Sequence, residues 1–521
     1  MFENEYTWGN ALAQGKEDEF NNKFDDAVKS IKNQFGKKYP AIINGKQIFS
    51  DETFDVKSPS DTRIVLGTFP KLTVSQISDA VFAAKNAFAK WSNMPYLDRT
   101  KIFKQTADEF SKNKFELAAW MSFENGKTRI EAINDIDEAI DFMRFYSDIL
   151  EKNEGFCKET NHPNPHEKTR TMLKPYGVWG IIAPFNFPSA IAIGMTTGAL
   201  LTGNTAVLKP SNATPLSSFF FVKIIIDKLP KGVINFVTGD GSTVGRAIIE
   251  NRDVEGIAFT GSYDVGMSSL KKFTKDSSKP FIAEMGGKNP VIVTKSANLD
   301  KASEGVMRAA FGFAGQKCSA CSRVYVQKEI VKEFIEKITS KSKSLKIGMP
   351  WSRDTFLGPV INNDAIVKFE DAINLAKKDG KIILGGEKIK HLGYEHGYFV
   401  QPTIVTDLPQ DHILETEELF LPFLCIRTFD NFDEAIKLSN KTEYGLTAGI
   451  FSEDKKQIEE FFEKIQAGTV YANRASSATT AALVQSQPFV GWKHSGSTGK
   501  GAGGENYLQQ FMRAQTQTLC D

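Results

Sequence analysis

The sequence predicts an α/β protein built around a parallel β-sheet. Short apolar runs alternate with helical patterns four times between residues 178 and 273, and a strand followed by a crossover helix is the repeating unit of such a sheet. The chain has 521 residues, more than the ~250–300 over which one hydrophobic core grows, so at least two domains are expected. The four pairs are 178–183 with 190–201, 206–208 with 216–229, 233–237 with 244–251, and 256–259 with 265–273.

A hairpin and several helices are expected before this sheet. The apolar residues between positions 20 and 35 recur at steps of three and four, which predicts a helix with one buried face. Asn44-Gly45 lies beside apolar residues and favours a type I′ hairpin turn. Residues 74 to about 150 carry helical patterns in several segments.

Three further segments complete the chain. Prolines and polar residues break the helical pattern between 154 and 174, so this segment is expected to leave the core. A second α/β stretch runs from about 289 to 485, and the tail from 499 has the pattern of a loop followed by a strand.

The composition argues against nucleic-acid binding and membrane insertion. Lys and Arg total 64 and Asp and Glu 63, a net charge of +1, whereas nucleic-acid binders normally carry a basic excess. The most apolar stretch, 190–208, contains threonines and glycines, so it is expected in a core rather than a membrane. No secretory signal is evident in residues 1–20.

The cysteines and histidines suggest neither a disulfide scaffold nor a metal site. Five cysteines are too few for such a scaffold and odd in number, so free thiols in a reducing cytoplasm are expected. The six histidines form no metal-binding pattern, and no metal is expected.

The nearest approach to a dinucleotide fingerprint is the run from Gly239 to Gly245. Its last spacing is one residue longer than GxGxxG. The run follows a predicted strand and opens a predicted helix, where an anion could contact backbone N–H groups. A plain strand-to-helix turn explains it equally well.

Cys318 is the cysteine with the most informative surroundings. Glycines three and six residues before it allow close backbone approach. Lys317 and Arg323 add positive charge that is expected to favour a thiolate. The alternatives are a buried small residue and, because Cys321 completes a CxxC pattern, a zinc or redox pair.

Four other sites carry groups suited to chemistry. Glu284 stands at a strand end before Gly-Gly, Asn186 lies between two prolines, Lys209 ends another predicted strand, and Glu418 stands in Glu-Glu-Leu-Phe-Leu-Pro. Together with Cys318, and in this order, these motifs resemble the aldehyde dehydrogenase superfamily over nearly the whole chain.

This resemblance implies three parts. A Rossmann-like cofactor domain would comprise 1–153 and 175–285, and an α/β catalytic domain 286–488. Residues 154–174 and 500–521 would form a small β oligomerisation flap that pairs subunits, so a homo-oligomer is expected.

The resemblance also assigns roles. Cys318 matches the nucleophile, Glu284 the base that activates water, and Asn186 a donor to the oxyanion. The implied cofactor is NAD, and NADP use is possible because Asn212 stands where many NAD-preferring relatives have Glu. The positions matched to the cofactor site are Phe185, Lys209, Ser211, Asn212, Gly241, Gly245, Gly261, Ser262, Glu418 and Phe420.

Three segments, 37–45, 138–146 and 315–323, are most similar to the 1-pyrroline-5-carboxylate dehydrogenases. This implies oxidation of glutamate 5-semialdehyde to glutamate. The alternatives are a dehydrogenase of another small aldehyde, a CoA-acylating relative, which typically lacks the base at Glu284, and an idle binding protein. The positions matched to the substrate site are Glu138, Phe187, Ser319, Ala481 and Ala482.

Overall fold

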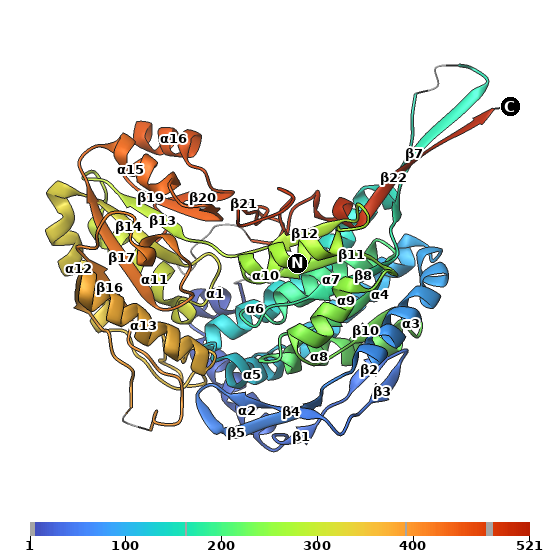
Figure 1. Ribbon diagram of the computed structural model, residues 1–521, viewed down its shortest axis with the longest axis horizontal. Coiled ribbons are helices and arrows are strands. Elements are labelled where there is room, and N and C mark those ends of the chain that lie inside the picture. The colour runs from blue at the N-terminus through green and yellow to red at the C-terminus, as the bar shows by residue number, and fades with distance from the viewer. Residues whose placement is uncertain (1–5, 162–163, 391–392, 476–482, 521) are drawn as a thin grey trace.

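The computed structural model describes residues 6–161, 164–390, 393–475 and 483–520. Figure 1 shows two α/β bodies side by side, and a β arm that ends at the C-terminus stands out from one of them. Each body contains a seven-stranded sheet. The predicted α/β class is therefore confirmed.

The first sheet has the order β12-β11-β8-β9-β10-β2-β3. All four predicted strand–helix pairs are present, and the strands from β8 to β12 run parallel. The predicted hairpin is confirmed at its edge, where Asn44 and Gly45 have φ of 52° and 71°, as a type I′ turn requires. The elements are β2 (Ala41–Ile43), β3 (Lys46–Ile48), β8 (Val178–Ile182), α7 (Ala190–Leu201), β9 (Thr205–Lys209), α8 (Pro215–Ile225), β10 (Ile234–Phe236), α9 (Arg246–Glu250), β11 (Val254–Thr260), α10 (Tyr263–Phe273) and β12 (Phe281–Glu284).

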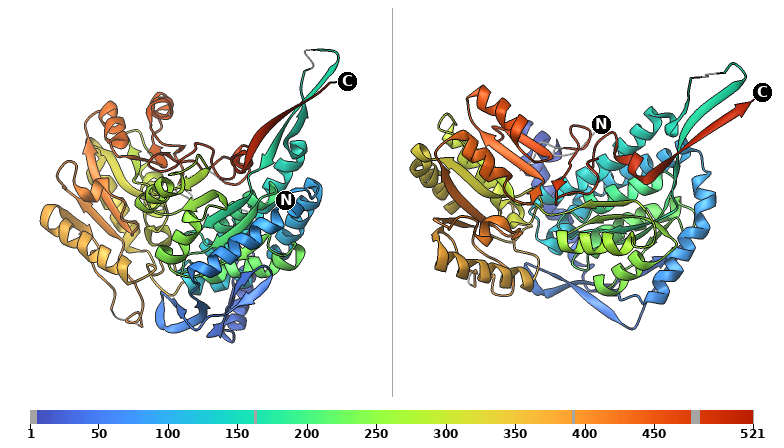
Figure 2. Two further views of the ribbon diagram at one scale, coloured as in Figure 1. Left: turned by 45° about the vertical axis from the view of Figure 1, so that its right-hand side comes forward. Right: turned by 45° about the horizontal axis from the view of Figure 1, so that its top comes forward.

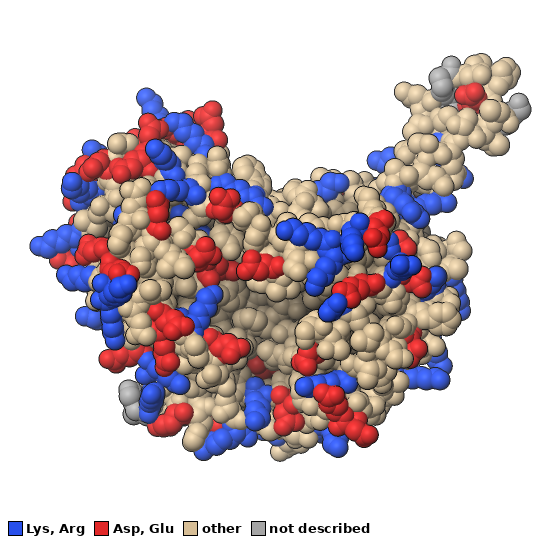
Figure 3. Space-filling model, viewed as in Figure 1, with Lys and Arg blue, Asp and Glu red and all other residues tan. Residues whose placement is uncertain are grey.

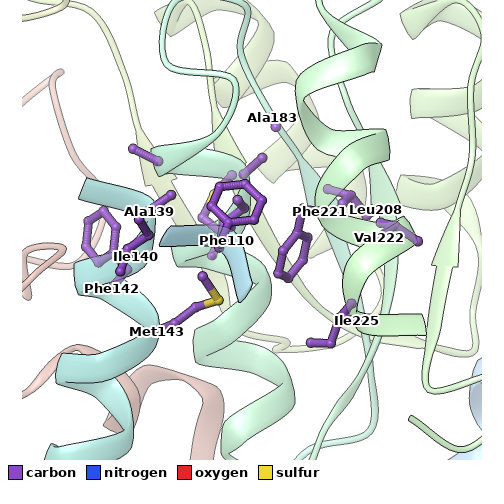
Figure 4. Packing of buried hydrophobic residues seen from close by; sticks show 14 of the residues in the cluster. Phe110, Ala139, Ile140, Phe142, Met143, Ala183, Leu208, Phe221, Val222 and Ile225 are labelled. Atoms are coloured by element: carbon purple, nitrogen blue, oxygen red, sulfur yellow. The ribbon is translucent and has the colours of Figure 1, made fainter. Parts of the chain in front are cut away.

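The helices expected before the sheet are also present. Figure 4 shows Phe110 of α4, Met143 of α6 and Phe221 of α8 in one apolar cluster. Phe24 and Ile31 of α2 are fully buried in the same core. A small sheet of order β1-β5-β4 adjoins these helices. The elements are α1 (Tyr6–Ala13), α2 (Glu17–Lys32), β1 (Lys37–Lys38), β4 (Thr53–Ser58), β5 (Asp61–Pro70), α3 (Val74–Ser92), α4 (Tyr96–Lys112), α5 (Lys114–Asn125) and α6 (Arg129–Lys152).

The second sheet has the order β15-β16-β17-β14-β13-β19-β20, with only β15 antiparallel among its described strands. A two-stranded ribbon of β18 and β21 lies outside it. The elements are β13 (Asn289–Val293), α11 (Leu299–Phe311), β14 (Cys321–Gln327), α12 (Val331–Lys343), α13 (Asn363–Asp379), β15 (Lys381–Leu384), β16 (Thr403–Thr406), α14 (Ile413–Thr416), β17 (Phe423–Phe429), α15 (Phe432–Asn440), β18 (Tyr444–Gly445), β19 (Thr447–Phe451), α16 (Lys455–Lys464), β20 (Thr469–Ala472) and β21 (Trp492–Lys493).

The arm is a three-stranded antiparallel sheet of order β22-β7-β6. It joins β6 (Cys157–Glu159) and β7 (Glu167–Pro175) to β22 (Met512–Cys520). Its strands extend beyond both bodies in every view (Figures 1 and 2), and most side chains of β22 are exposed.

Charged side chains of both signs are interspersed over the face drawn in Figure 3, which is hollowed between the two bodies. Among the described residues, no helix is both long and apolar enough to span a membrane.

Candidate active site

A pocket of about 500 Å³ is lined by residues of both bodies. Its walls come from the carboxyl ends of β8, β9 and β11 and from the residues that precede β13 and β14. Eleven of the predicted catalytic and cofactor residues line it: Phe185, Asn186, Lys209, Ser211, Asn212, Gly241, Gly261, Ser262, Cys318, Glu418 and Phe420.

The turn that presents Cys318 is held tightly. Gly315 has φ of +68°, and a Cβ on it would lie 2.1 Å from the carbonyl oxygen of Leu421. The side-chain amide of Asn289 donates to the carbonyl oxygens of Cys318 at 2.7 Å and Ala320 at 2.9 Å. The backbone around the thiol is therefore fixed by contacts from other segments.

The prediction that Lys317 and Arg323 favour a Cys318 thiolate is wrong. The Lys317 ammonium lies 3.2 Å from a carboxylate oxygen of Glu131, and the Arg323 guanidinium donates to backbone carbonyls, including that of Lys288 at 2.9 Å. Burial raises the pKa of the Cys318 thiol to about 12, and the carboxylates of Glu418 and Glu284 contribute to the rise. The resting thiol is therefore protonated near neutral pH.

Glu284 is the last residue of β12 and pairs with Thr260 of β11 in the sheet register. Its buried Oε2 atom has no hydrogen-bond partner among the described residues. Burial raises the pKa of this carboxyl to about 8. A buried acid without a structural partner is costly, and a pKa near the working pH is what general-base chemistry needs.

Glu284 is expected to lower the stability of the fold as the pH rises. Its ordinary pKa is 4.5 and its folded pKa is about 8, so folding disfavours the charged form. Its contribution to stability is therefore greatest below pH 4.5 and is lost as the pH rises towards about 8.

Glu284→Gln should consequently melt at a higher temperature than the wild type at about pH 8.5, with a smaller difference at about pH 5. Differential scanning calorimetry at the two pH values measures this. A difference in Tm that is the same at both values would contradict it.

Two glycines after Glu284 make room for Glu418. A Cβ on Gly286 would lie 2.2 Å from Oε2 of Glu418, and one on Gly287 would lie 2.5 Å from the carbonyl oxygen of Cys318. The backbone N–H of Gly287 donates to Oε1 of Glu418 at 2.8 Å. The Gly-Gly pair thus brings Glu418 and the Cys318 turn together.

The pocket is also lined by Lys209, Asn212 and Gly241, which lie at or after the ends of the neighbouring strands β9 and β10. Lys209 ends β9 and is 5% exposed. Burial lowers the pKa of its ammonium to about 8, and it donates to the carbonyl oxygen of Pro210 at 3.1 Å. A Cβ on Gly245 would stand 3.8 Å from the Lys209 side chain, which places this predicted residue beside the pocket.

The predicted substrate residues lie at several places around the site, whereas most of the predicted cofactor residues line one pocket. Phe187 lies beneath the Lys127 ammonium, which is 3.5 Å from its ring centroid. Ser319 follows the thiol directly, and its carbonyl oxygen accepts from the Thr447 hydroxyl at 3.3 Å. Glu138 lies on α6 and not on the pocket wall. Ala481 and Ala482 lie outside the described residues.

Two residues at the site were not predicted from the sequence. Lys368 of α13 lines the pocket and donates to the carbonyl oxygen of Glu418 at 2.7 Å. It has the sequence pattern of an ordinary surface lysine, so no signal could have found it. Asn289 lies in the Glu-Met-Gly-Gly-Lys-Asn-Pro stretch, but its contact with the Cys318 turn depends on the pairing of β13 with β14.

Comparison with known proteins identifies the family. The aldehyde dehydrogenase family model matches residues 48–517. The 1-pyrroline-5-carboxylate dehydrogenase of Oceanobacillus iheyensis is 36% identical over 501 residues, 95% of each chain. A structure of 1-pyrroline-5-carboxylate dehydrogenase from Thermus with bound NAD is 32% identical, with a TM-score of 0.91 and 96% of each chain covered.

Proline utilization A from Bdellovibrio bacteriovorus is 35% identical, with a TM-score of 0.91 over 96% of this chain. The match covers 52% of that chain, so this protein spans about half its length. The resemblance inferred from the motifs is confirmed, and the chain belongs to the aldehyde dehydrogenase family.

Proposed function

We propose that this protein oxidises glutamate 5-semialdehyde, the open form of 1-pyrroline-5-carboxylate, to glutamate with NAD⁺. The observation that carries the proposal is the pairing of a thiol, Cys318, with an acid, Glu284, whose charge acts on that thiol and whose buried Oε2 atom has no hydrogen-bond partner among the described residues. The similarity to 1-pyrroline-5-carboxylate dehydrogenases over 95% of the chain supports the choice of substrate.

The residues around the pocket fit a dinucleotide. Lys209 presents a buried ammonium that can donate to ribose hydroxyls, and Glu418 presents a carboxylate that can accept from a second ribose. The rings of Phe420 and Phe185 pack edge to face on the pocket wall, with their centroids 5.7 Å apart. A nicotinamide dinucleotide held by these residues would supply the acceptor for the hydride that leaves the aldehyde carbon.

In the first half of the reaction, the Cys318 sulfur adds to the aldehyde carbon and forms a thiohemiacetal. The thiol proton must leave as the carbon–sulfur bond forms, and Glu284 is the base that takes it, directly or through a water molecule. The oxyanion accepts hydrogen bonds from the side-chain amide of Asn186 and the backbone N–H of Cys318. Loss of hydride then leaves a thioester on the sulfur.

In the second half, water hydrolyses the thioester. Between the two halves Glu284 releases the thiol proton to solvent, so that its carboxylate can take a proton from the water as the water oxygen attacks the thioester carbon. The carbon–sulfur bond breaks, Glu284 passes that proton to the Cys318 sulfur, and the product departs after its acid proton is lost to solvent. One acid can serve both halves because burial holds its pKa at about 8.

Reduction of NAD⁺ with a panel of aldehydes tests the proposed substrate. We expect kcat/KM to be highest for 1-pyrroline-5-carboxylate and lower for propionaldehyde and succinate semialdehyde. A preference for one of the others would overturn the substrate while leaving the mechanism intact.

We also propose that the arm formed by β6, β7 and β22 pairs subunits in a homo-oligomer. The support is that the arm stands clear of both bodies (Figure 1) and that β22 forms the edge of its sheet. An exposed sheet edge is a template for pairing with another chain. A cytoplasmic location is supported by the five free thiols.

A further inference from the structure

An acidic side chain stands beside the Lys209 end of the pocket. Asp240 lies in the turn between β10 and α9. Its Oδ1 accepts a hydrogen bond from the Asn212 side-chain amide at 3.0 Å, and its Oδ2 lies 3.5 Å from the Lys71 ammonium. The Asp240 side chain is half exposed, at 50%.

The direction of the pocket places the adenosine half of a dinucleotide near Asp240. Cys318, Lys209, Asn212 and Gly241 all line the pocket. In the sheet order β12-β11-β8-β9-β10, Lys209 ends β9 and Gly241 follows β10. Glu284, whose charge acts on the Cys318 thiol, ends β12, three strands away from β9. The nicotinamide ring must reach the carbon that Cys318 attacks, so the adenosine ribose lies towards Lys209. This step rests on the proposed use of a dinucleotide.

Asp240 places a negative charge beside residue 212, which is itself neutral. Residue 212 is a neutral Asn, which by itself would tolerate a 2′-phosphate on the adenosine ribose. Its amide, however, is held by the Asp240 carboxylate, whose charge also acts on Lys209. Lys71 offsets that charge only in part, because it is shared with Glu52 at 3.7 Å.

We propose that Asp240 determines coenzyme preference in this protein, because its carboxylate repels the 2′-phosphate of NADP⁺ and leaves NAD⁺ favoured. The inference makes Asp240, rather than residue 212, the position at which the preference can be changed.

Asp240→Asn tests the proposal, because asparagine keeps the shape and the acceptor for Asn212 and removes only the charge. Isothermal titration calorimetry should give a wild-type Kd for NADP⁺ at least about tenfold above that for NAD⁺, a ratio that one nearby unit charge can produce. In Asp240→Asn the ratio of the Kd for NADP⁺ to the Kd for NAD⁺ should fall about tenfold, mainly because NADP⁺ binds more tightly.

Asp253→Asn is the matched control. Asp253 is 46% exposed and pairs with Lys85 at 2.7 Å, but it precedes β11 at the end remote from Thr260 and the pocket. This variant should keep the wild-type ratio. Raising the salt concentration should bring the Kd for NADP⁺ closer to the Kd for NAD⁺ in the wild type and in Asp253→Asn. The same change should have a much smaller effect in Asp240→Asn.

The fragments 5′-AMP and adenosine 2′,5′-bisphosphate give a second readout independent of turnover, and the variant should gain affinity only for the bisphosphate. If Asp240→Asn still binds both dinucleotides and its affinity ratios for the two dinucleotides and the two fragments equal those of the wild type, the role of Asp240 is overturned. The proposed function would still stand. Failure of the wild type to bind either dinucleotide would overturn both.

Discussion

Cys318→Ser is expected to lower kcat for aldehyde oxidation by about 10⁴-fold or more, since losses of this size follow removal of a nucleophile that acts with its base as one unit. Serine keeps the size of the side chain but is a far weaker nucleophile than a thiolate. Steady-state NAD⁺ reduction with 1-pyrroline-5-carboxylate measures the loss, and calorimetric titration with NAD⁺ should show that binding is kept.

Cys520→Ser is the control for this variant. Cys520 is an exposed cysteine at the end of β22 in the arm, so its replacement should leave kcat unchanged. Retention of even a tenth of wild-type kcat in Cys318→Ser would contradict covalent catalysis at this sulfur.

Glu284→Gln is expected to separate the two halves of the reaction. The amide fills the same space but cannot take a proton from water, so steady-state turnover should fall by about 10²–10⁴-fold. The first turnover needs no hydrolysis and should still give a burst of reduced coenzyme, which stopped-flow absorbance measures. The burst itself should be slower, because the base that receives the thiol proton is also gone.

The wild-type rate should depend on the ionisation of the same carboxyl. Glu284 acts as a base only when ionised, and its pKa is about 8, so kcat should rise with pH to about 8 and then level off. Glu255→Gln is the control, because Glu255 is 40% exposed and pairs with Lys279 at 3.7 Å. A Glu284→Gln enzyme with the wild-type rate and pH profile would rule out Glu284 as the base.

Much of the fold could be predicted because its signals are local. The alternation of apolar runs and helical patterns from 178 to 273 identified four strand–helix pairs, and Asn44-Gly45 identified a turn whose backbone requires those residues. The candidate nucleophile and base were found for a similar reason, since each stands among glycines that leave a short, readable motif.

The charge state of the site could not be predicted, because it depends on contacts between distant segments. Lys317 is one residue from the thiol, yet its charge is engaged by Glu131 of α6. Arg323 is turned towards backbone carbonyls. Likewise, Asn212 alone suggested tolerance of NADP, whereas its partner Asp240 lies 28 residues further along the chain.

The most direct test of covalent catalysis at Cys318 is to trap the intermediate. Glu284→Gln would be mixed with NAD⁺ and 1-pyrroline-5-carboxylate, quenched in acid, digested and mapped by mass spectrometry. The proposed mechanism predicts a glutamyl thioester on the sulfur of Cys318, and none on Cys321, which is buried at the start of β14. A label on another residue, or turnover with no covalent adduct at all, would contradict it.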